Sequence, residues 1–160
     1  MLATPSTLTH AGIGCIAMSF ALLVMSAVHA DEIAAPSLPA TSPDSLYVRM
    51  GGKDVITAIA DELIEHSATD AKLKRSFAKS NLPRLKQLVG EQFCALTGGP
   101  CVYSGDAMKE VHAGLDIRQD EFYGMVESLR VILEQQHVGL SERNEFLALL
   151  APMKRDVVTR

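Results

Sequence analysis

The sequence contains no tryptophan, and aromatic residues make up only 5% of its 160 positions. Aliphatic side chains must therefore build most of any core. A basic run is also missing, and the formal net charge is −4. A mildly acidic chain of this kind argues against nucleic acid as the main partner. Alternating apolar and polar stretches and internal repeats are absent as well, so the pattern does not favour a β-rich or a repeat architecture.

The first 30 residues lack Lys, Arg, Asp and Glu altogether. Residues 13–28 form a run of apolar and small residues, shorter than the roughly 20 that a membrane-spanning helix needs. The run ends in Val28-His29-Ala30, which has the small-residue form of a signal-peptidase site. We therefore predict a signal peptide over residues 1–30 and a periplasmic or secreted protein without stable membrane insertion. Because the first twelve residues carry no Lys or Arg, an uncleaved membrane anchor is the alternative.

Two cysteines remain after this segment, since Cys15 lies within it. Cys94 and Cys101 are seven residues apart and bracket the turn signal at residues 97–100. In an oxidising compartment this spacing favours a disulfide that closes over a helix end. Two unpaired buried thiols are the alternative. A zinc site is disfavoured, because no CxxC or HxxxH spacing accompanies them.

Residues 31–43 are rich in Pro, Ala and Ser and predict a flexible linker. From residue 44 to 157 apolar residues recur at helical spacing, which predicts a single all-α domain. The expected helices are a short one before Gly51, then 53–67, a short passage 73–77, 82–96, a segment around His112 that ends at Gly114, 119–136, and a last one with Ser141 as N-cap.

His112 shares a helical stripe with apolar residues, because Met108, Val111, His112 and Leu115 are spaced at i, i+3, i+4 and i+7. A buried imidazole must find a partner to replace its lost hydration. A backbone carbonyl, a carboxylate, a metal or a haem iron could serve. The commonest case for such a histidine is a satisfied core residue.

Several strings together resemble the group I truncated haemoglobins. They are Leu46 to Gly52, Asp70 to Phe77, Thr97 to Gly99 with Tyr103 to Gly105, and Met108 to Leu115. Their order and intervals fit that family over about residues 44–157. The resemblance implies a two-over-two sandwich of α-helices around haem b, with His112 as the proximal ligand of the iron.

The resemblance also implies the residues around the cofactor. Phe77 would pack against the porphyrin, the stripe of residues 82–96 would form one wall, and Lys86 and Lys53 are candidate partners for the propionates. The expected cofactor-binding set is His112, Phe77, Leu85, Lys86, Val89, Met108 and Tyr103.

The distal side departs from the family pattern. Where many members carry a tyrosine on the second helix, an ungapped alignment places Ile64, and the polar positions of the distal helix correspond to Leu85, Leu88 and Val89. Gln92 is the nearest side chain able to donate, although its neighbours suggest that it faces the rim. Bound oxygen is more polar than bound carbon monoxide, so loss of a donor should weaken oxygen relative to carbon monoxide.

Two functions follow as hypotheses. The first is a globin that reversibly binds a diatomic gas (O2, CO or NO) rather than a dedicated enzyme, with nitric oxide or peroxide chemistry when an unidentified electron donor supplies reductant. The second is a haem-free exported helical module for interaction. A metal-binding bundle built from His66, His112 and His137 is disfavoured, since these lie on separate elements without paired carboxylates.

Overall fold

The computed structural model describes residues 41–160, and none of these residues forms a β-strand. The prediction of an all-α domain is confirmed. The predicted signal peptide and most of the predicted linker lie outside the described residues. The elements are α1 (Leu46–Arg49), α2 (Gly52–Thr69), α3 (Lys74–Phe77), α4 (Leu82–Leu96), α5 (Met108–Val111), α6 (Gln119–Gln135), α7 (Leu140–Leu150), the 3-10 turn η1 (Ala151–Met153) and α8 (Lys154–Val157).

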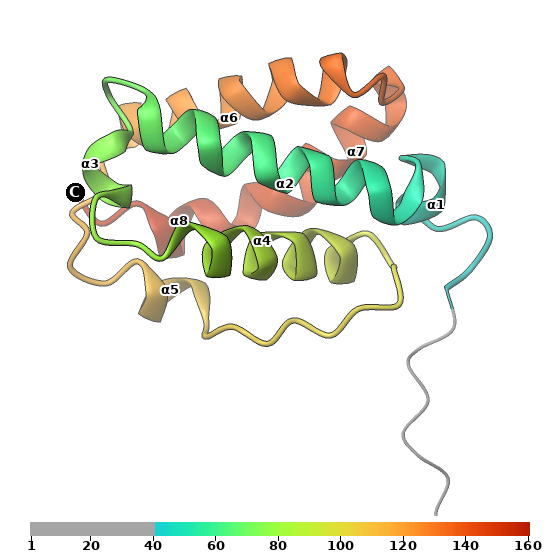
Figure 1. Ribbon diagram of the computed structural model, residues 1–160, viewed down its shortest axis with the longest axis horizontal. Coiled ribbons are helices and arrows are strands. Elements are labelled where there is room, and N and C mark those ends of the chain that lie inside the picture. The colour runs from blue at the N-terminus through green and yellow to red at the C-terminus, as the bar shows by residue number, and fades with distance from the viewer. Residues whose placement is uncertain (1–40) are drawn as a thin grey trace, which may run out of the picture. The chain divides into compact units, whose positions relative to one another are not determined.

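Four helices form two layers, in which α2 and α4 pack together and face α6 and α7 (Figure 1). Helix α2 contacts both α4 and α6, and α1 contacts α7. Phe93 of α4 meets Phe146 of α7 edge to face, with ring centroids 4.9 Å apart. The two-over-two arrangement that the resemblance implied is confirmed. Among the described residues, no helix is long and apolar enough to cross a membrane.

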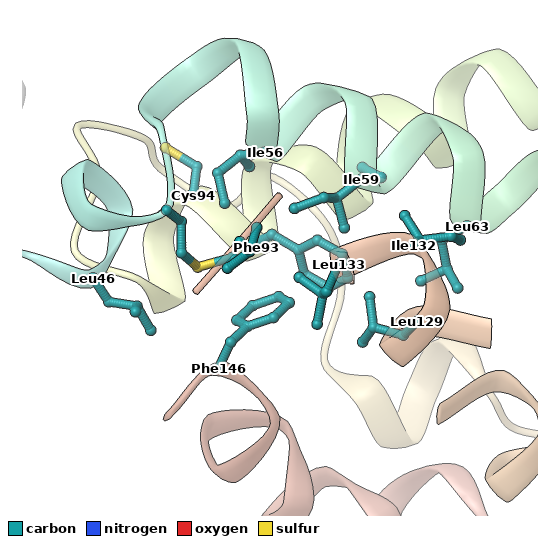
Figure 2. Close-up of a cluster of buried hydrophobic side chains, with 13 residues drawn as sticks. Leu46, Ile56, Ile59, Leu63, Phe93, Cys94, Leu129, Ile132, Leu133 and Phe146 are labelled. Carbon is teal, nitrogen blue, oxygen red and sulfur yellow. The ribbon is translucent and has the colours of Figure 1, made fainter. Parts of the chain in front are cut away.

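The main core lies towards the α1 end of these layers. Figure 2 shows buried side chains from α1, α2, α4 and α6 gathered near Phe146 of α7, which is fully buried. Each fully buried side chain of this size stabilises the fold by about 1.5–3 kcal/mol relative to an exposed one. The labelled members of this cluster are Leu46, Ile56, Ile59, Leu63, Phe93, Cys94, Leu129, Ile132, Leu133 and Phe146.

Two helices differ from their predicted form. The segment around His112 is a single turn that ends at Val111, and His112 is its C-cap. Leu115 therefore lies beyond the helix and Val111 is 41% exposed, so the predicted continuous helix is wrong, although all four residues of the predicted stripe line one cavity. Similarly, α7 begins at Leu140 after Gly139, and Ser141 lies inside its first turn rather than at the N-cap.

A long segment without helix joins α4 to α5 (Figure 1). Its start is fixed by the disulfide Cys94–Cys101, which is present as the spacing predicted. The N–H of Tyr47 also donates to the carbonyl of Thr97 at 2.8 Å, which ties α1 to the end of α4. The backbone of Gly99 lies in close contact with Cys94 and Tyr47 in this turn. A Cβ added there would lie 2.6 Å from Cys94 Sγ and 2.6 Å from Tyr47 Cδ2.

We expect Gly99→Ala to destabilise the protein by about 1–3 kcal/mol, because the added methyl overpacks against a cross-linked cysteine and a ring. Gly90→Ala is the matched control. Its Cβ would meet nothing closer than Ala60 Cβ at 3.8 Å, and alanine in a helix interior is favoured over glycine by about 0.5–1 kcal/mol. Denaturant unfolding of both variants measures the difference. An unchanged midpoint for Gly99→Ala would contradict the close packing of this turn.

Candidate functional site

A largely apolar cavity of about 270 Å³ lies between α4 and the segment around His112. Helices α2, α3 and α6 and the C-terminal residues complete its walls. Volumes of this order lie near the lower end of the range for small-molecule pockets. All the predicted cofactor and distal residues except Lys86 line it, namely Ile64, Phe77, Leu85, Leu88, Val89, Gln92, Tyr103, Met108 and His112.

The imidazole of His112 is half-buried at the cavity wall. Its Nδ1 lies 2.7 Å from the carbonyl oxygen of Met108, one turn earlier. Because a carbonyl only accepts, Nδ1 carries the proton and donates it. In the neutral ring the other nitrogen, Nε2, then keeps its lone pair. This is the arrangement of a histidine that ligates a metal through one nitrogen and is oriented through the other.

Four of the five predicted distal positions carry apolar side chains that line the cavity. Ile64 on α2 is 1% exposed. Leu85, Leu88 and Val89 on α4 are spaced three and four residues apart, so they share one face. Their role towards a bound ligand stays a prediction.

Gln92 lines the cavity one turn further along α4, and its amide is engaged. Its Nε2 lies 3.3 Å from the sulfur of Met108 and 3.9 Å from that of Met153. These sulfurs belong to the segment before His112 and to the C-terminal η1. The amide thus contacts the side of the cavity that carries His112.

Lys86 is not where the resemblance placed it. Its ammonium forms an ion pair with Glu65 of α2, and it does not line the cavity. The hydrogen bond that its ammonium donates to Glu65 raises the pKa of Lys86 above its ordinary value, and burial partly offsets this rise. Lys53, the second propionate candidate, is also absent from the lining. On the helix Lys86 lies about 100° round from Leu85 and outside the cavity lining, and its assignment to cofactor binding stays a prediction.

The other two histidines within residues 41–160, His66 and His137, are not brought to the cavity. His66 lies in a separate groove between α2 and α6, beside Glu62, Glu65 and Glu127. Within residues 41–160, no group of three His, Cys, Asp or Glu side chains is placed to hold a metal ion. The metal-binding bundle considered from the sequence is thus not supported by the arrangement of these side chains.

Tyr103 closes one rim of the cavity. Its hydroxyl donates to the carbonyl of Asp106 at 3.0 Å, and its ring lies over Gly105, where a Cβ would be 2.3 Å from the hydroxyl oxygen. Burial, and then the negative charges of Asp106 and Glu91, raise the pKa of Tyr103. The phenol therefore stays neutral at physiological pH and remains a donor to the loop rather than to a ligand.

The sequence did not predict the contributions of α6 and of the chain end, which supply Phe122, Met125, Val126, Met153 and Val157 to the lining. Nor did it predict Glu121, which is 3% exposed at the cavity edge. Burial raises the pKa of Glu121, but hydrogen bonds from the Arg118 N–H and from Arg75 outweigh it and hold that pKa below its ordinary value. This carboxylate is therefore ionised and partnered.

These features fit a haem on two counts. A haem is a flat, mostly apolar disc, so it needs apolar walls on both faces and one axial nitrogen. The cavity supplies the walls from α4 on one side and from the His112 segment on the other. The hydrogen bond at Nδ1 leaves Nε2 of His112 as the free nitrogen donor.

Comparison with known proteins points in the same direction. The family model described as bacterial-like globin matches residues 45–159. The group 1 truncated hemoglobin of Mycolicibacterium paratuberculosis is 31% identical over 117 residues, which cover 73% of this chain and 86% of that protein. The group 1 truncated hemoglobin of a Nostoc species is 26% identical over 116 residues, which cover 72% of this chain and 98% of that protein.

Solved structures show the same helical arrangement. The truncated hemoglobin of Tetrahymena pyriformis in its Fe(III) form gives a TM-score of 0.69 at 22% identity, and the match covers 72% of this chain and 99% of that one. The 2/2 hemoglobin of a Synechococcus species, with covalently attached heme, gives a TM-score of 0.67 at 20% identity. This match covers 72% of this chain and 99% of that one. At sequence identities of 22% and 20%, these matches show a shared fold.

Proposed function

Since this chain belongs to the bacterial-like globins and is a group I truncated globin, we propose that its cavity holds haem b with His112 as the axial ligand of the iron. Globins of this family bind haem and diatomic gases. For this chain we propose two specific points: His112 ligates the iron, and the pocket reversibly binds O2, CO or NO. Haem supplies the metal centre to which such a gas binds.

The observation that carries the proposal is the hydrogen bond from His112 Nδ1 to the Met108 carbonyl. It selects the tautomer in which Nε2 can ligate, and it holds the ring against rotation. The same hydrogen bond would also satisfy a core histidine, so the argument against a haem-free module comes from membership of the globin family. The haem-free alternative is therefore not favoured.

We expect His112→Ala to empty the pocket of haem or to leave it loosely held, because the single protein–iron bond is removed. Added imidazole should partly restore the spectrum, since the vacated volume accepts that ring. Absorption and resonance Raman spectra of the ferrous protein measure both effects. His66→Ala is the control, because His66 lies in the groove between α2 and α6. An iron–histidine band that persists in His112→Ala would overturn the assignment.

The apolar distal wall determines how the pocket would treat different gases. A donor aimed at a bound ligand contributes on the order of 1–3 kcal/mol when that ligand gains negative charge. Oxygen gains more charge on binding than carbon monoxide does. With Ile64, Leu85, Leu88 and Val89 as neighbours, oxygen loses this stabilisation and carbon monoxide loses little. We therefore propose rapid oxygen release, which suits gas sensing or nitric oxide chemistry better than storage.

We expect Ile64→Tyr to slow oxygen dissociation about tenfold, the effect of roughly 1.4 kcal/mol, and to change carbon monoxide release much less. Ile64→Phe is the matched control, because it adds the ring without the hydroxyl. Laser photolysis and stopped-flow mixing measure both rates. If oxygen already dissociates slowly from the unmodified protein and Ile64→Tyr changes nothing, another group donates and the apolar interpretation is wrong.

We further propose that the protein is exported, with residues 1–30 removed and the mature chain beginning near Asp31. The apolar run and the Val28-His29-Ala30 signal support this, and a disulfide between Cys94 and Cys101 suits an oxidising compartment. A membrane anchor formed by the uncleaved segment is the competing form.

We expect the intact mass of the protein recovered from the periplasm or the medium to correspond to a chain starting near Asp31. Without reductant, Cys94 and Cys101 should resist alkylation, and with reductant both should react. Retention of residues 1–30 would contradict cleavage. Two thiols that react freely in protein never exposed to reductant would contradict the bond.

A further inference from the structure

One arginine joins the two sides of the cavity edge. Arg75 lies on α3, directly before the lining residues Ser76 and Phe77. Its Nη1 donates to the carbonyl of Leu115 at 2.8 Å, and its Nη2 donates to that of Asp116 at 3.1 Å. Both carbonyls belong to the loop that follows His112. The guanidinium therefore connects α3 directly to the segment that carries the axial histidine.

The same guanidinium is anchored by a buried carboxylate. Nη2 of Arg75 lies 3.0 Å from both oxygens of Glu121, and Nε lies 3.3 Å from one of them. Glu121 also accepts from the N–H of Arg118 at 2.8 Å, at the start of α6. The Glu121 side chain is 3% exposed and that of Arg75 is 51% exposed. One charged pair thus fastens α3, the loop and the first turn of α6 together.

The loop has little regular structure of its own. Helix α5 is a single turn, and its main helical contact is with α8. Gly114 and Asp116 both have positive φ, at 75° and 49°, so the backbone makes a left-handed bend that aspartate adopts at a cost. On its other side the loop is held by hydrogen bonds from the N–H groups of Thr159 and Arg160 to the carbonyl of Ile117.

We propose that Arg75 is a positioning residue for the haem iron: its bridge from Glu121 to the Leu115 and Asp116 carbonyls fixes the loop after His112, and thereby the axial imidazole and the closed edge of the cavity. The inference rests on the proposed haem binding. It assigns to Arg75 an effect on the iron–histidine bond and on haem retention without any contact between Arg75 and the iron.

Arginine is required here rather than positive charge alone. Its planar fork reaches two carbonyls and a carboxylate at once, whereas a lysine ammonium is a single point of donation. Arg75→Lys can keep the charge opposite Glu121 but cannot reproduce both loop contacts. Arg75→Met keeps much of the apolar stem and removes every donor.

The experiment uses the full chain loaded with haem and compares Arg75→Met and Arg75→Lys with two controls. Arg130→Met removes an arginine of matched exposure, 52%, that pairs with Glu127 on α6. Ile59→Val loosens the core at a residue that does not line the cavity. The measurements are the iron–histidine stretching band of the ferrous form, the rate of haem transfer to excess apomyoglobin, and amide hydrogen exchange over residues 113–118 in haem-free protein.

We expect Arg75→Met to release haem about tenfold faster, in line with the loss of charge-assisted hydrogen bonds, and to shift or broaden the iron–histidine band. Exchange over residues 113–118 should accelerate even without haem. Arg75→Lys should show the same changes to a smaller degree, and Arg130→Met should show none. Ile59→Val should lower the unfolding midpoint while leaving the band in place.

Arg75 variants with an unchanged band, haem release and loop exchange would overturn the inference while leaving haem binding intact. So would an Ile59→Val variant that shifts the band as far as Arg75→Met does, because general loosening would then suffice. Complete rescue by Arg75→Lys would also overturn it in favour of charge alone. Absence of a Soret band from the unmodified protein would instead overturn the proposed function, and the positioning role with it.

Discussion

The candidate site depends on one constraint: an apolar space has to stay open between α4 and the segment around His112. An unfilled apolar cavity forfeits dispersion contacts, so the surrounding structure must resist collapse into it. In this chain the tight core around Phe146 adjoins the cavity, because Leu63, Phe93 and Leu129 belong to both. At the edge of the cavity, the Arg75–Glu121 pair ties α3 to the loop after His112 and to the start of α6. A group that fills the space therefore stabilises the fold it enters.

Most of the helical framework could be predicted from the sequence because α2, α4 and α6 each bury a stripe of regular period. The short helices α1 and α3 were predicted as well, but the form of the segment around His112 was not. The turn containing Met108 looked like part of a longer helix, since Leu115 continues its spacing, but the backbone leaves the helix at Gly114 and Asp116 through positive φ angles. Such angles are permissive for glycine and only occasionally adopted by aspartate. The hydrophobic pattern alone does not indicate which residues adopt a positive φ angle.

The wall residues of the site were predictable for the same periodic reason, and its edges were not. Leu85, Leu88 and Val89 share a helix face, so placing one of them at the cavity places all three. Lys86 shares that segment but not that face, and its partner Glu65 comes from a neighbouring helix. The pair of Arg75 and Glu121 joins residues 46 positions apart in the sequence. Neither partner carries a local signal, since exposed arginines and helix N-terminal glutamates are common for other reasons.

Three of the polar side chains that line the cavity, those of Tyr103, Glu121 and Gln92, have partners within the protein. The Tyr103 hydroxyl donates to the Asp106 carbonyl, and the Glu121 carboxylate accepts from Arg75 and Arg118. The Gln92 amide contacts two sulfurs on the side that carries His112. Each of these three side chains therefore has its hydrogen-bonding capacity engaged away from the space itself. Under the proposed haem binding, discrimination among small ligands would then come from their size and from the strength of their bond to the iron. Hydrogen bonding to an accumulating negative charge, which separates oxygen from carbon monoxide most sharply, would contribute little.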